Sequence, residues 1–263
     1  MNTIRLAIFD LGGTIVDKYS LSPFLSLKHA FKMKGLQIPN SLIFKDMGKH
    51  KYDHINDILL DKDIYNKWKL AYDREPDHTD CDDIFNIFNI YQLNEGIQKI
   101  EILPETKKCI DWLGDNNIST GVTTGFNKPI MSLISDKLYE NDIFIDKYVS
   151  STCLGKPGRP NPHMIREIMS ILSIEDPIKV IKIDDTGVGI QEGKNAGCIT
   201  VGVAKYSTLM KMKDYDERLS REEYIERLKN SREILWSSNP DYVIDTLDEL
   251  PNIIKHINSE SNI

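Results

Sequence analysis

The chain has 263 residues, enough for one large domain or two smaller ones with a sizeable core. Its 33 Lys and Arg residues against 40 Asp and Glu residues give a formal charge of −7, which argues against bulk nucleic-acid binding. Since the sequence shows neither a signal segment nor an apolar run of about 18 residues, we expect no membrane partner and a cytoplasmic location. The four cysteines lie far apart and indicate free thiols rather than a zinc site.

Short apolar, β-branched runs alternate with amphipathic stretches through most of the chain, a pattern typical of a parallel sheet covered by helices. The predicted strands are Arg5–Phe9, Ser119–Thr123, Ile143–Val149, Val180–Ile183 and Thr200–Val203. The predicted helices of this part of the chain are Glu105–Leu113, Arg221–Leu235 and Leu247–Ile257. We therefore expect an α/β fold with a doubly wound, Rossmann-like parallel sheet as its core.

Residues 20–98 interrupt this alternation. They contain almost no strand pattern, and helical periodicity recurs in Phe24–Met33, His54–Leu60, Ile64–Ala71 and Ile84–Leu93. We predict a helical cap domain at 20–98, inserted after the first strand, with residues 1–19 and 99–263 forming the α/β core. A movable cap can close over a site at the end of the first strand, exclude water and supply groups that recognise the substrate.

The first predicted strand leads directly into Asp10, which is followed by Leu11, Gly12, Gly13 and Thr14. A carboxylate at the carboxyl end of a buried strand, next to a glycine turn that can surround an anion, indicates a nucleophile or a metal ligand. The alternative is an aspartate that only caps the turn. Position 12 carries no side chain, so any mechanism for Asp10 must work without a carboxylic acid there.

Two further segments can bind an anion. Thr124 and Gly125 come directly after Thr123, the last residue of the second predicted strand. A hydroxyl and backbone amides at this point can bind a phosphoryl oxygen, although such a sequence also forms ordinary turns. Arg159 precedes Pro160 and Pro162, which hold the chain extended and would aim a permanent cation at a fixed point. The alternatives there are a basic surface loop, or Lys156 in the same role.

A third segment is acidic. Asp184 and Asp185 end a buried apolar strand and repel each other unless a cation or protons intervene. Together with Asp10 they suggest oxygen ligands for Mg²⁺, which would leave positions for water and phosphate. Turn-forming residues exposed to solvent are the alternative.

In this order the four segments resemble the motifs of the haloacid dehalogenase superfamily: Asp-x-x-Gly-Thr at 10–14, a strand-end Thr, a basic residue before Pro-x-Pro, and an acidic strand end. The resemblance implies a Mg²⁺-dependent hydrolase of phosphorylated compounds that works through an aspartyl-phosphate at Asp10. Members usually have a second Asp two residues further on, which protonates the leaving alkoxide. Here that residue is Gly12.

A segment of the predicted cap narrows the resemblance from the superfamily to one family within it. Residues 47–54 match the pattern Met-Gly-x-x-Lys-x-Asp-His of the phosphonatase family, and similar patterns recur at 10–17, 123–125, 158–162, 192–197 and 241–246. The resemblance implies that Lys51, or less directly Lys49, forms a Schiff base with a substrate aldehyde. Met47 and His54 would be its pocket partners, and a homodimer would form through the cap helices. A solvated basic loop is the alternative for this segment.

The absence of a carboxylic acid at position 12 agrees with a Schiff-base mechanism, because an imine on Lys51 can accept the electrons of a breaking C–P bond. We expect Asp10, the Gly12 carbonyl and Asp185 to hold Mg²⁺, and Thr124, Gly125 and Arg159 to bind a phosphonate. Burial and the cations Lys49 and His54 would lower the Lys51 pKa. The expected products are acetaldehyde and phosphate.

Three positions differ from the family pattern or have no assigned role, and they are compatible with other functions. Phe126 stands where the family has Tyr, Gly189 stands where the superfamily often has a second acid, and the role of Asp184 is open. A hydrolase of another phosphonate or of a small phosphate monoester is therefore one alternative, and a catalytically silent ligand-binding relative is another.

Overall fold

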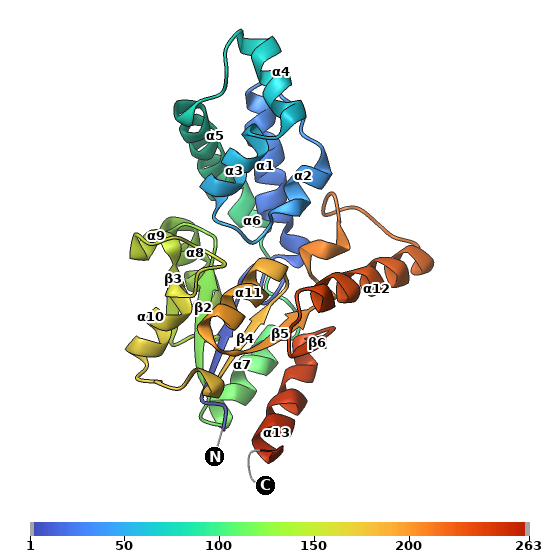
Figure 1. The fold of residues 1–263 in the computed structure, drawn as a ribbon. Coiled ribbons are helices and arrows are strands. Elements are labelled where there is room, and N and C mark those ends of the chain that lie inside the picture. Colours follow the sequence, from blue (N-terminus) through green and yellow to red (C-terminus); the bar gives the residue numbers. More distant parts are fainter. Residues whose placement is uncertain (1–2, 261–263) are drawn as a thin grey trace.

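The computed structural model describes residues 3–260 of the protein. The centre of the molecule is a six-stranded sheet in which all neighbours are parallel and the order is β3-β2-β1-β4-β5-β6. The strands are β1 (Leu6–Phe9), β2 (Ser119–Thr124), β3 (Lys147–Ser150), β4 (Val180–Asp184), β5 (Ile199–Val203) and β6 (Tyr242–Ile244). Because successive strands lie on either side of β1, this order confirms the predicted doubly wound α/β fold (Figure 1).

Helices cover both faces of the sheet. One face packs against α7 (Thr106–Asp115), α8 (Lys128–Glu140) and α13 (Leu250–Glu260). The other packs against α10 (His163–Ile171), α11 (Gly187–Ala196) and α12 (Arg221–Ser237), with the short α9 (Ser151–Leu154) next to β3. Every residue of β1 is therefore buried, which is why this strand is a continuous apolar run in the sequence.

The helices between β1 and α7 form a second group above the carboxyl ends of the strands (Figure 1). They are α1 (Leu21–Met33), α2 (Asn40–Lys45), α3 (Lys51–Leu59), α4 (Lys62–Tyr72), α5 (His78–Tyr91) and α6 (Ile97–Lys99), with a π-helical turn at Gln92–Gly96. This cap has its own hydrophobic cluster around Phe24, Phe31 and Trp68, to which Met210 and Met212 of the core also contribute. The domain limits at residues 20 and 98 stay a prediction.

The elements differ from the predicted ranges where side chains cap or interrupt them. β3 begins at Lys147 rather than Ile143, because the Asp146 carboxylate accepts hydrogen bonds from the amide and hydroxyl of Thr120 at 2.7 and 3.2 Å. α5 begins at His78 rather than Ile84, because Asp77 and Asp80 form a capping box in front of it. The short elements α2 and β6 and the longer helices α8 and α11 were not predicted. Within residues 3–260, no helix is both long and apolar enough to cross a membrane.

Candidate active site

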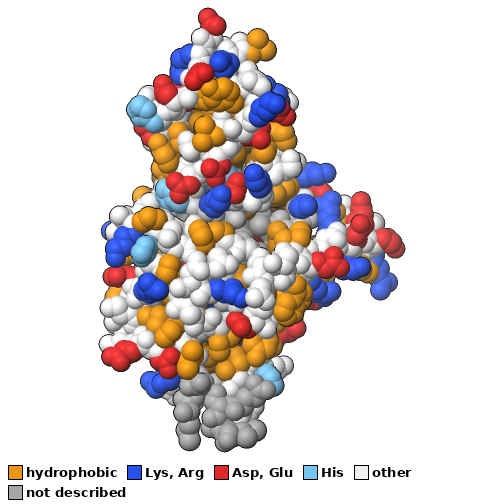
Figure 2. Space-filling view, viewed as in Figure 1, with side chains coloured by type: hydrophobic (Ala, Val, Ile, Leu, Met, Phe, Trp, Pro, Cys, Tyr) orange, Lys and Arg blue, Asp and Glu red, His pale blue; other side chains and the backbone are white. Residues whose placement is uncertain are grey.

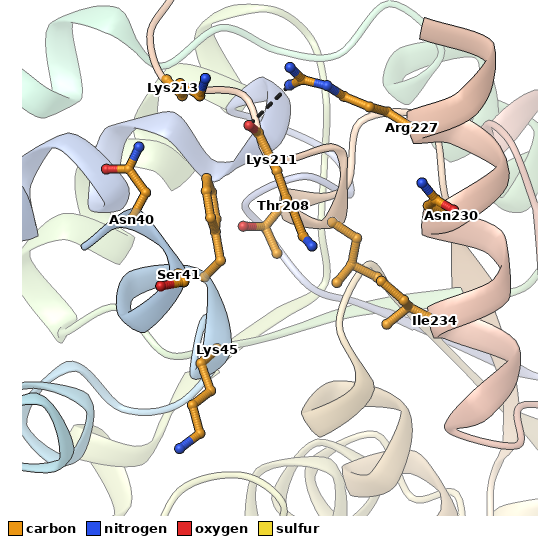
Figure 3. Close-up of a pocket in the computed structure, with 11 residues that line it drawn as sticks. Asn40, Ser41, Lys45, Thr208, Lys211, Lys213, Arg227, Asn230 and Ile234 are labelled. Atoms are coloured by element: carbon orange, nitrogen blue, oxygen red, sulfur yellow. Dashed lines mark hydrogen bonds between the residues drawn. The ribbon is translucent and has the colours of Figure 1, made fainter. Parts of the chain in front are cut away.

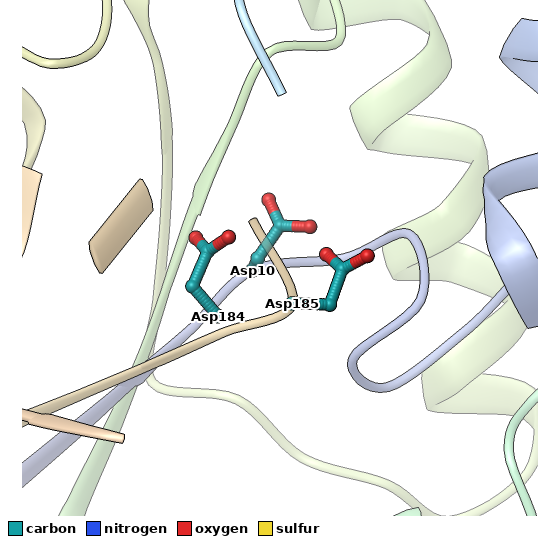
Figure 4. A group of neighbouring side chains, drawn as sticks. All are labelled: Asp10, Asp184 and Asp185. Atoms are coloured by element: carbon teal, nitrogen blue, oxygen red, sulfur yellow. The ribbon is translucent and has the colours of Figure 1, made fainter. Parts of the chain in front are cut away.

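Three adjacent strands bring the acidic site residues together. β1 lies between β2 and β4, and Phe9 is in register with Val122 on one side and Ile183 on the other. Because parallel neighbours end at the same edge, Asp10 lies between Thr124 and the Asp184-Asp185 pair. One ligand oxygen from each of Asp10, Asp184 and Asp185 lies within 4.8 Å of the others, and all three residues are buried (Figure 4).

The two neighbouring aspartates differ in their contacts. Asp184 receives hydrogen bonds from the amide and hydroxyl of Thr186, at 3.0 and 2.7 Å, and its other oxygen lies 2.9 Å from Lys182 Nζ. Burial alone would raise the pKa of Asp184, but the charges of Lys182 and Arg159 hold it below its ordinary value. Asp184 is therefore an ionised carboxylate: its Oδ2 has no hydrogen-bond partner among the described residues, but it is ion-paired with Lys182 and, at 3.4 Å, with Arg159.

Asp185 has one carboxylate oxygen that no described residue contacts through a hydrogen bond or an ion pair. Its Oδ2 accepts a hydrogen bond from the Thr208 amide at 2.9 Å, whereas its buried Oδ1 has no hydrogen-bond partner among the described residues. Burial, followed by the negative charges of Asp10 and Asp184, raises the pKa of Asp185 well above its ordinary value. A buried carboxylate oxygen without a donor, next to other carboxylates, fits a hard divalent cation.

The glycine turn lies directly against this carboxylate. Gly13 has a φ of +76°, and a Cβ there would lie 2.4 Å from Asp185 Oδ2. The backbone of the turn therefore approaches the acidic cluster more closely than any residue with a side chain would permit. Asp10, Asp185 and the Gly12 carbonyl are the donor set that sequence analysis predicted for a metal, and the acidic residues present are able to hold a divalent ion.

The packing of Asp184 also explains why position 189 carries no side chain. A Cβ on Gly189 would lie 1.9 Å from the Asp184 carboxyl group. The Asp184 side chain thus fills the space that a side chain at position 189 would need, so an acid at 184 and an acid at 189 exclude each other in this backbone.

Arg159 is the cation of the site, and its guanidinium is fixed on several sides. It lies 2.8 Å from Asp10 Oδ1, donates from Nη2 to the Thr123 carbonyl and hydroxyl at 2.6 and 2.9 Å, and donates from Nε to Glu192 at 2.9 Å. Its side chain is only 1% exposed. Arg159 is therefore a rigid, permanently charged neighbour of Asp10.

Lys182 and Glu192 belong to the same buried network, and sequence analysis missed both. Lys182 Nζ donates to the Thr123 hydroxyl at 3.0 Å and lies 3.8 Å from Glu192. Both side chains are completely buried. The available signal was a lysine between two isoleucines in a strand that is otherwise apolar, since a buried charge needs a partner of opposite sign.

The cap loop before α3 closes over these residues. Gly48 has a φ of +94°, and a Cβ there would lie 2.7 Å from the Thr186 hydroxyl. On the core side, a Cβ on Gly125 would lie 2.9 Å from the Lys49 carbonyl. Two glycines that face each other in this way let the cap backbone lie directly on the core.

Lys51 is the first residue of α3 and is only 5% exposed. Its Nζ has a long hydrogen bond, 3.4 Å, to the Lys49 carbonyl. The Lys51 pKa is lowered from 10.5 to about 8, chiefly by burial and also by the Arg159 charge, against the raising effect of Asp10 and Asp185. Lys51 is therefore partly unprotonated near neutral pH.

The cause of this shift differs in part from the sequence prediction. Lys49 is paired with Asp46 at 2.6 Å and with Asp57 at 3.0 Å, which raise its pKa. His54 is fully buried with a pKa lowered to about 3, chiefly by burial, so it is uncharged. Neither residue supplies an unpaired positive charge to Lys51, and burial with Arg159 accounts for the lowered pKa instead.

A single pocket contains all but one of the residues predicted for the site. Its walls are formed by Asp10, Gly12, Ser20, Pro23, Met47, Gly48, Lys51, Thr124, Gly125, Phe126, Arg159, Asp185 and Thr186. His54 is not part of the wall, because its ring lies in the cap with Nε2 3.4 Å from the Leu42 carbonyl. The pocket measures about 30 Å³, roughly the volume of one water molecule. The cap is therefore closed in this structure.

Comparison with known proteins agrees with this geometry. The family model of haloacid dehalogenase-like hydrolases matches residues 4–197. The chain is 32% identical to the phosphonoacetaldehyde hydrolase of Latilactobacillus sakei, over 97% of this chain and 96% of that protein, and 32% identical to the enzyme of the same name from Lactiplantibacillus plantarum, over 97% of each.

Solved structures support the same assignment. A phosphonoacetaldehyde hydrolase-like protein from Oleispira antarctica superimposes with a TM-score of 0.91 at 26% identity, over 97% of this chain and 93% of that one. A hydrolase from Pseudomonas syringae, at 14% identity and a TM-score of 0.68 over 95% and 98% of the chains, shares the fold. The fold and the site are those of a hydrolase. The chain belongs to the haloacid dehalogenase-like hydrolases and, within them, to the phosphonoacetaldehyde hydrolase family.

Proposed function

We propose that the protein hydrolyses the C–P bond of phosphonoacetaldehyde to acetaldehyde and phosphate, through a Schiff base on Lys51 and an aspartyl-phosphate on Asp10. The observation that carries the proposal is a buried lysine with a lowered pKa in the same pocket as a buried strand-end carboxylate. The homologous enzymes from the two lactic acid bacteria support the same substrate.

The environment of Lys51 suits imine formation, because only the neutral amine attacks a carbonyl. With a pKa of about 8, roughly a quarter of Lys51 is neutral at pH 7.5, against about 0.1% for a lysine with an unperturbed pKa. Lys49, whose pKa is raised by two aspartates, lacks this advantage. Lys51 is therefore the residue that we expect to form the imine.

The steps follow from the residues in the pocket. The Lys51 amine condenses with the aldehyde and releases water. Asp10 then attacks phosphorus, a new O–P bond forms, and the electrons of the breaking P–C bond enter the protonated imine to give a neutral enamine. Water hydrolyses the aspartyl-phosphate, and protonation and hydrolysis of the enamine release acetaldehyde and free Lys51. The leaving carbon needs no acid at position 12, since the imine accepts its electrons.

Binding groups surround the same point. We propose that Arg159, the Thr124 hydroxyl and the Gly125 amide bind the phosphonate oxygens, while Met47 contacts the organic part of the substrate. Asp10, Asp185 and the Gly12 carbonyl would hold Mg²⁺, which when bound supplies positive charge to the phosphonate. We further propose that His54 positions α3 from behind the pocket, since its ring lies in the cap.

Substrate entry requires the cap to move. A pocket of about 30 Å³ cannot hold a substrate with several heavy atoms. The direct contacts of Gly48 with Thr186 and of the Lys49 carbonyl with Gly125 are the ones that would open. Reclosure would bring Lys51 to the aldehyde and exclude water from the imine.

The test is phosphate release from phosphonoacetaldehyde against a panel of phosphomonoesters, with Mg²⁺ and with EDTA. We expect turnover of phosphonoacetaldehyde that Asp10→Asn abolishes, and borohydride reduction that fixes a two-carbon adduct on Lys51. Lys49→Arg should still be trapped and Lys51→Arg should not. Trapping on Lys49, or no trapping with turnover intact, would contradict the Schiff-base mechanism.

The same panel tests a second candidate, hydrolysis of another phosphonate or of a small phosphate ester. Phe126 favours this candidate, because it forms part of the pocket wall without a hydroxyl group. A preference for a phosphomonoester, with no effect of Lys51→Arg, is the result expected for it.

We also propose a homodimer joined through the cap, where large apolar side chains such as Leu70 (89% exposed) and Ile90 (61% exposed) are solvent-accessible. Light scattering of wild type and Leu70→Glu tests this, and a monomeric wild type would contradict it. The cytoplasmic location stays a prediction, which the four free cysteines support.

A further inference from the structure

A second, larger cavity lies where the cap meets the core, away from the active-site pocket (Figure 3). It measures about 630 Å³, the size of a site for a small organic ligand. Its walls come from α2 (Asn40, Ser41, Phe44, Lys45), from the segment after β5 (Thr208, Leu209, Lys211, Lys213) and from α12 (Arg227, Asn230, Ile234). Because α2 belongs to the cap and α12 to the core, an occupant would contact both.

The charge of this cavity is opposite to that of the whole chain. Four of its wall residues are cationic and none is acidic among the described residues, in a chain of net charge −7. Within residues 3–260, Lys45, Lys211 and Lys213 form no ion pair, whereas Arg227 is held by Glu217 at 3.0 Å and by the Lys211 carbonyl at 3.1 Å. In Figure 2, Lys and Arg side chains gather at this junction of the cap with the region of α12.

The other wall residues include apolar and polar groups. Phe44, Leu209 and Ile234 supply apolar surface, and Phe44 is itself held by stacking on Phe24 with ring centroids 4.7 Å apart. An inorganic ion alone would leave this apolar surface exposed to water. The lining therefore matches an anion that carries an apolar body.

Thr208 provides an independent observation. It is only 2% exposed, and its Oγ1 has no hydrogen-bond partner among the described residues although it belongs to the cavity wall. Leaving a buried hydroxyl without a partner is unfavourable. A ligand oxygen in the cavity would satisfy this group. The Thr208 amide donates to Asp185 Oδ2 at 2.9 Å, so the wall of this cavity directly contacts an acidic residue of the active site.

We propose that this cavity is a second binding site, for a small organic anion with an apolar body, a carboxylate or a phosphate ester. The anion contacts Lys45 of the cap and Lys211 and Lys213 of the core, which have no ion pair within residues 3–260, and it accepts the hydrogen bond of Thr208 Oγ1. Because it contacts both domains, its binding stabilises the closed cap. The binding site itself is independent of the function proposed above.

The test uses 8-anilinonaphthalene-1-sulfonate, an aromatic anion, in a fluorescence titration of metal-free wild type. We expect saturable binding of one probe per chain, a higher melting temperature with the probe, and no displacement by inorganic phosphate. Lys211→Glu with Lys213→Glu should weaken binding at least tenfold. The matched control is Lys62→Glu with Lys67→Glu on α4, exposed lysines without ion pairs in the described structure, which should change the dissociation constant less than twofold.

Further variants separate the contributions. Thr208→Val, which removes the hydroxyl and keeps the shape, should weaken binding about threefold to tenfold. If circular dichroism shows that the Lys211→Glu with Lys213→Glu variant is unfolded, Lys211→Gln with Lys213→Gln takes its place, because it removes both positive charges without adding negative ones. Displacement by adenosine monophosphate or by octanoate tells a phosphate ligand from a carboxylate. Binding that is non-saturable, or equally strong in the variants and the control, would overturn the proposal, whether or not the enzyme cleaves phosphonoacetaldehyde.

Discussion

Replacing Lys51 by Met should inactivate the enzyme and, at neutral pH, stabilise the fold. The pKa of Lys51 is about 8 in the folded protein and 10.5 ordinarily. The unfolded chain therefore binds more protons between these two values, and the stability of wild type rises with pH across that window. Below pH 8 the whole penalty of burying a charged lysine is present, and it amounts to about 3 kcal/mol at pH 7. A methionine of similar length lacks this penalty.

The measurement is urea unfolding of both proteins in EDTA, from pH 7 to pH 9.5. Lys51→Met should be more stable than wild type at pH 7 by up to about 3 kcal/mol, and the difference should shrink by about 2 kcal/mol at pH 9.5. Phosphate release by the variant should be undetectable. A gain in stability on loss of a catalytic group is expected where activity depends on a buried charge.

Lys49→Met is the matched control, because Lys49 lies on the same segment but is ion-paired and its pKa is raised. This variant should show no stabilisation that fades with rising pH, and it should still form the borohydride-reducible adduct. The reasoning fails if Lys51→Met is no more stable than wild type at pH 7, or if its advantage is the same at both ends of the pH range.

Four further substitutions, at three positions, test the packing of the site. Gly12→Ala should keep activity in a phosphate-release assay, since a Cβ there would lie 3.0 Å from the hydroxyl of Ser20, which can rotate away. In the same assay Gly12→Asp should lower activity more than tenfold, because it places an acid next to the buried Asp17. Lys182→Met removes a completely buried cation from a network of carboxylates and should lower the free energy of unfolding by about 3–5 kcal/mol, so an unchanged urea midpoint would refute its structural role. Gly125→Ala obstructs the contact with the cap, and its kcat for phosphonoacetaldehyde should fall severalfold with little change in melting temperature; equal losses of both would indicate misfolding instead.

Much of the core followed from the sequence because a parallel sheet covered on both faces needs apolar strands throughout. The same reasoning placed Asp10 and Asp185 together, since adjacent parallel strands end at one edge. It could not assign separate roles to Asp184 and Asp185. Alternating side chains put Lys182 and Asp184 on the same face of β4, where they pair at 2.9 Å, and this leaves Asp185 with a carboxylate oxygen that has no donor among the described residues.

In the cap, too, the sequence predicted one part of the site and the structure was needed for the other. Its sequence pattern was sufficient to name Lys51 as the candidate amine, but three residues further along α3 the ring of His54 contacts the Leu42 carbonyl instead of the pocket. Burial sets the pKa of both side chains, and burial depends on helices that are distant in sequence.

The α/β class follows from the sequence alone, because the alternation of apolar strands with amphipathic helices is a local pattern. Local motifs and the family resemblance also named the candidate site residues, whose roles stay predictions, as do the limits of the inserted cap. Three features could be seen only in the folded protein: which aspartate oxygen has neither a donor nor a cation among the described residues, what occupies the space beside Gly189, and what lowers the pKa of Lys51. Each of these depends on distances between segments that folding brings together, and short-range sequence patterns do not contain those distances.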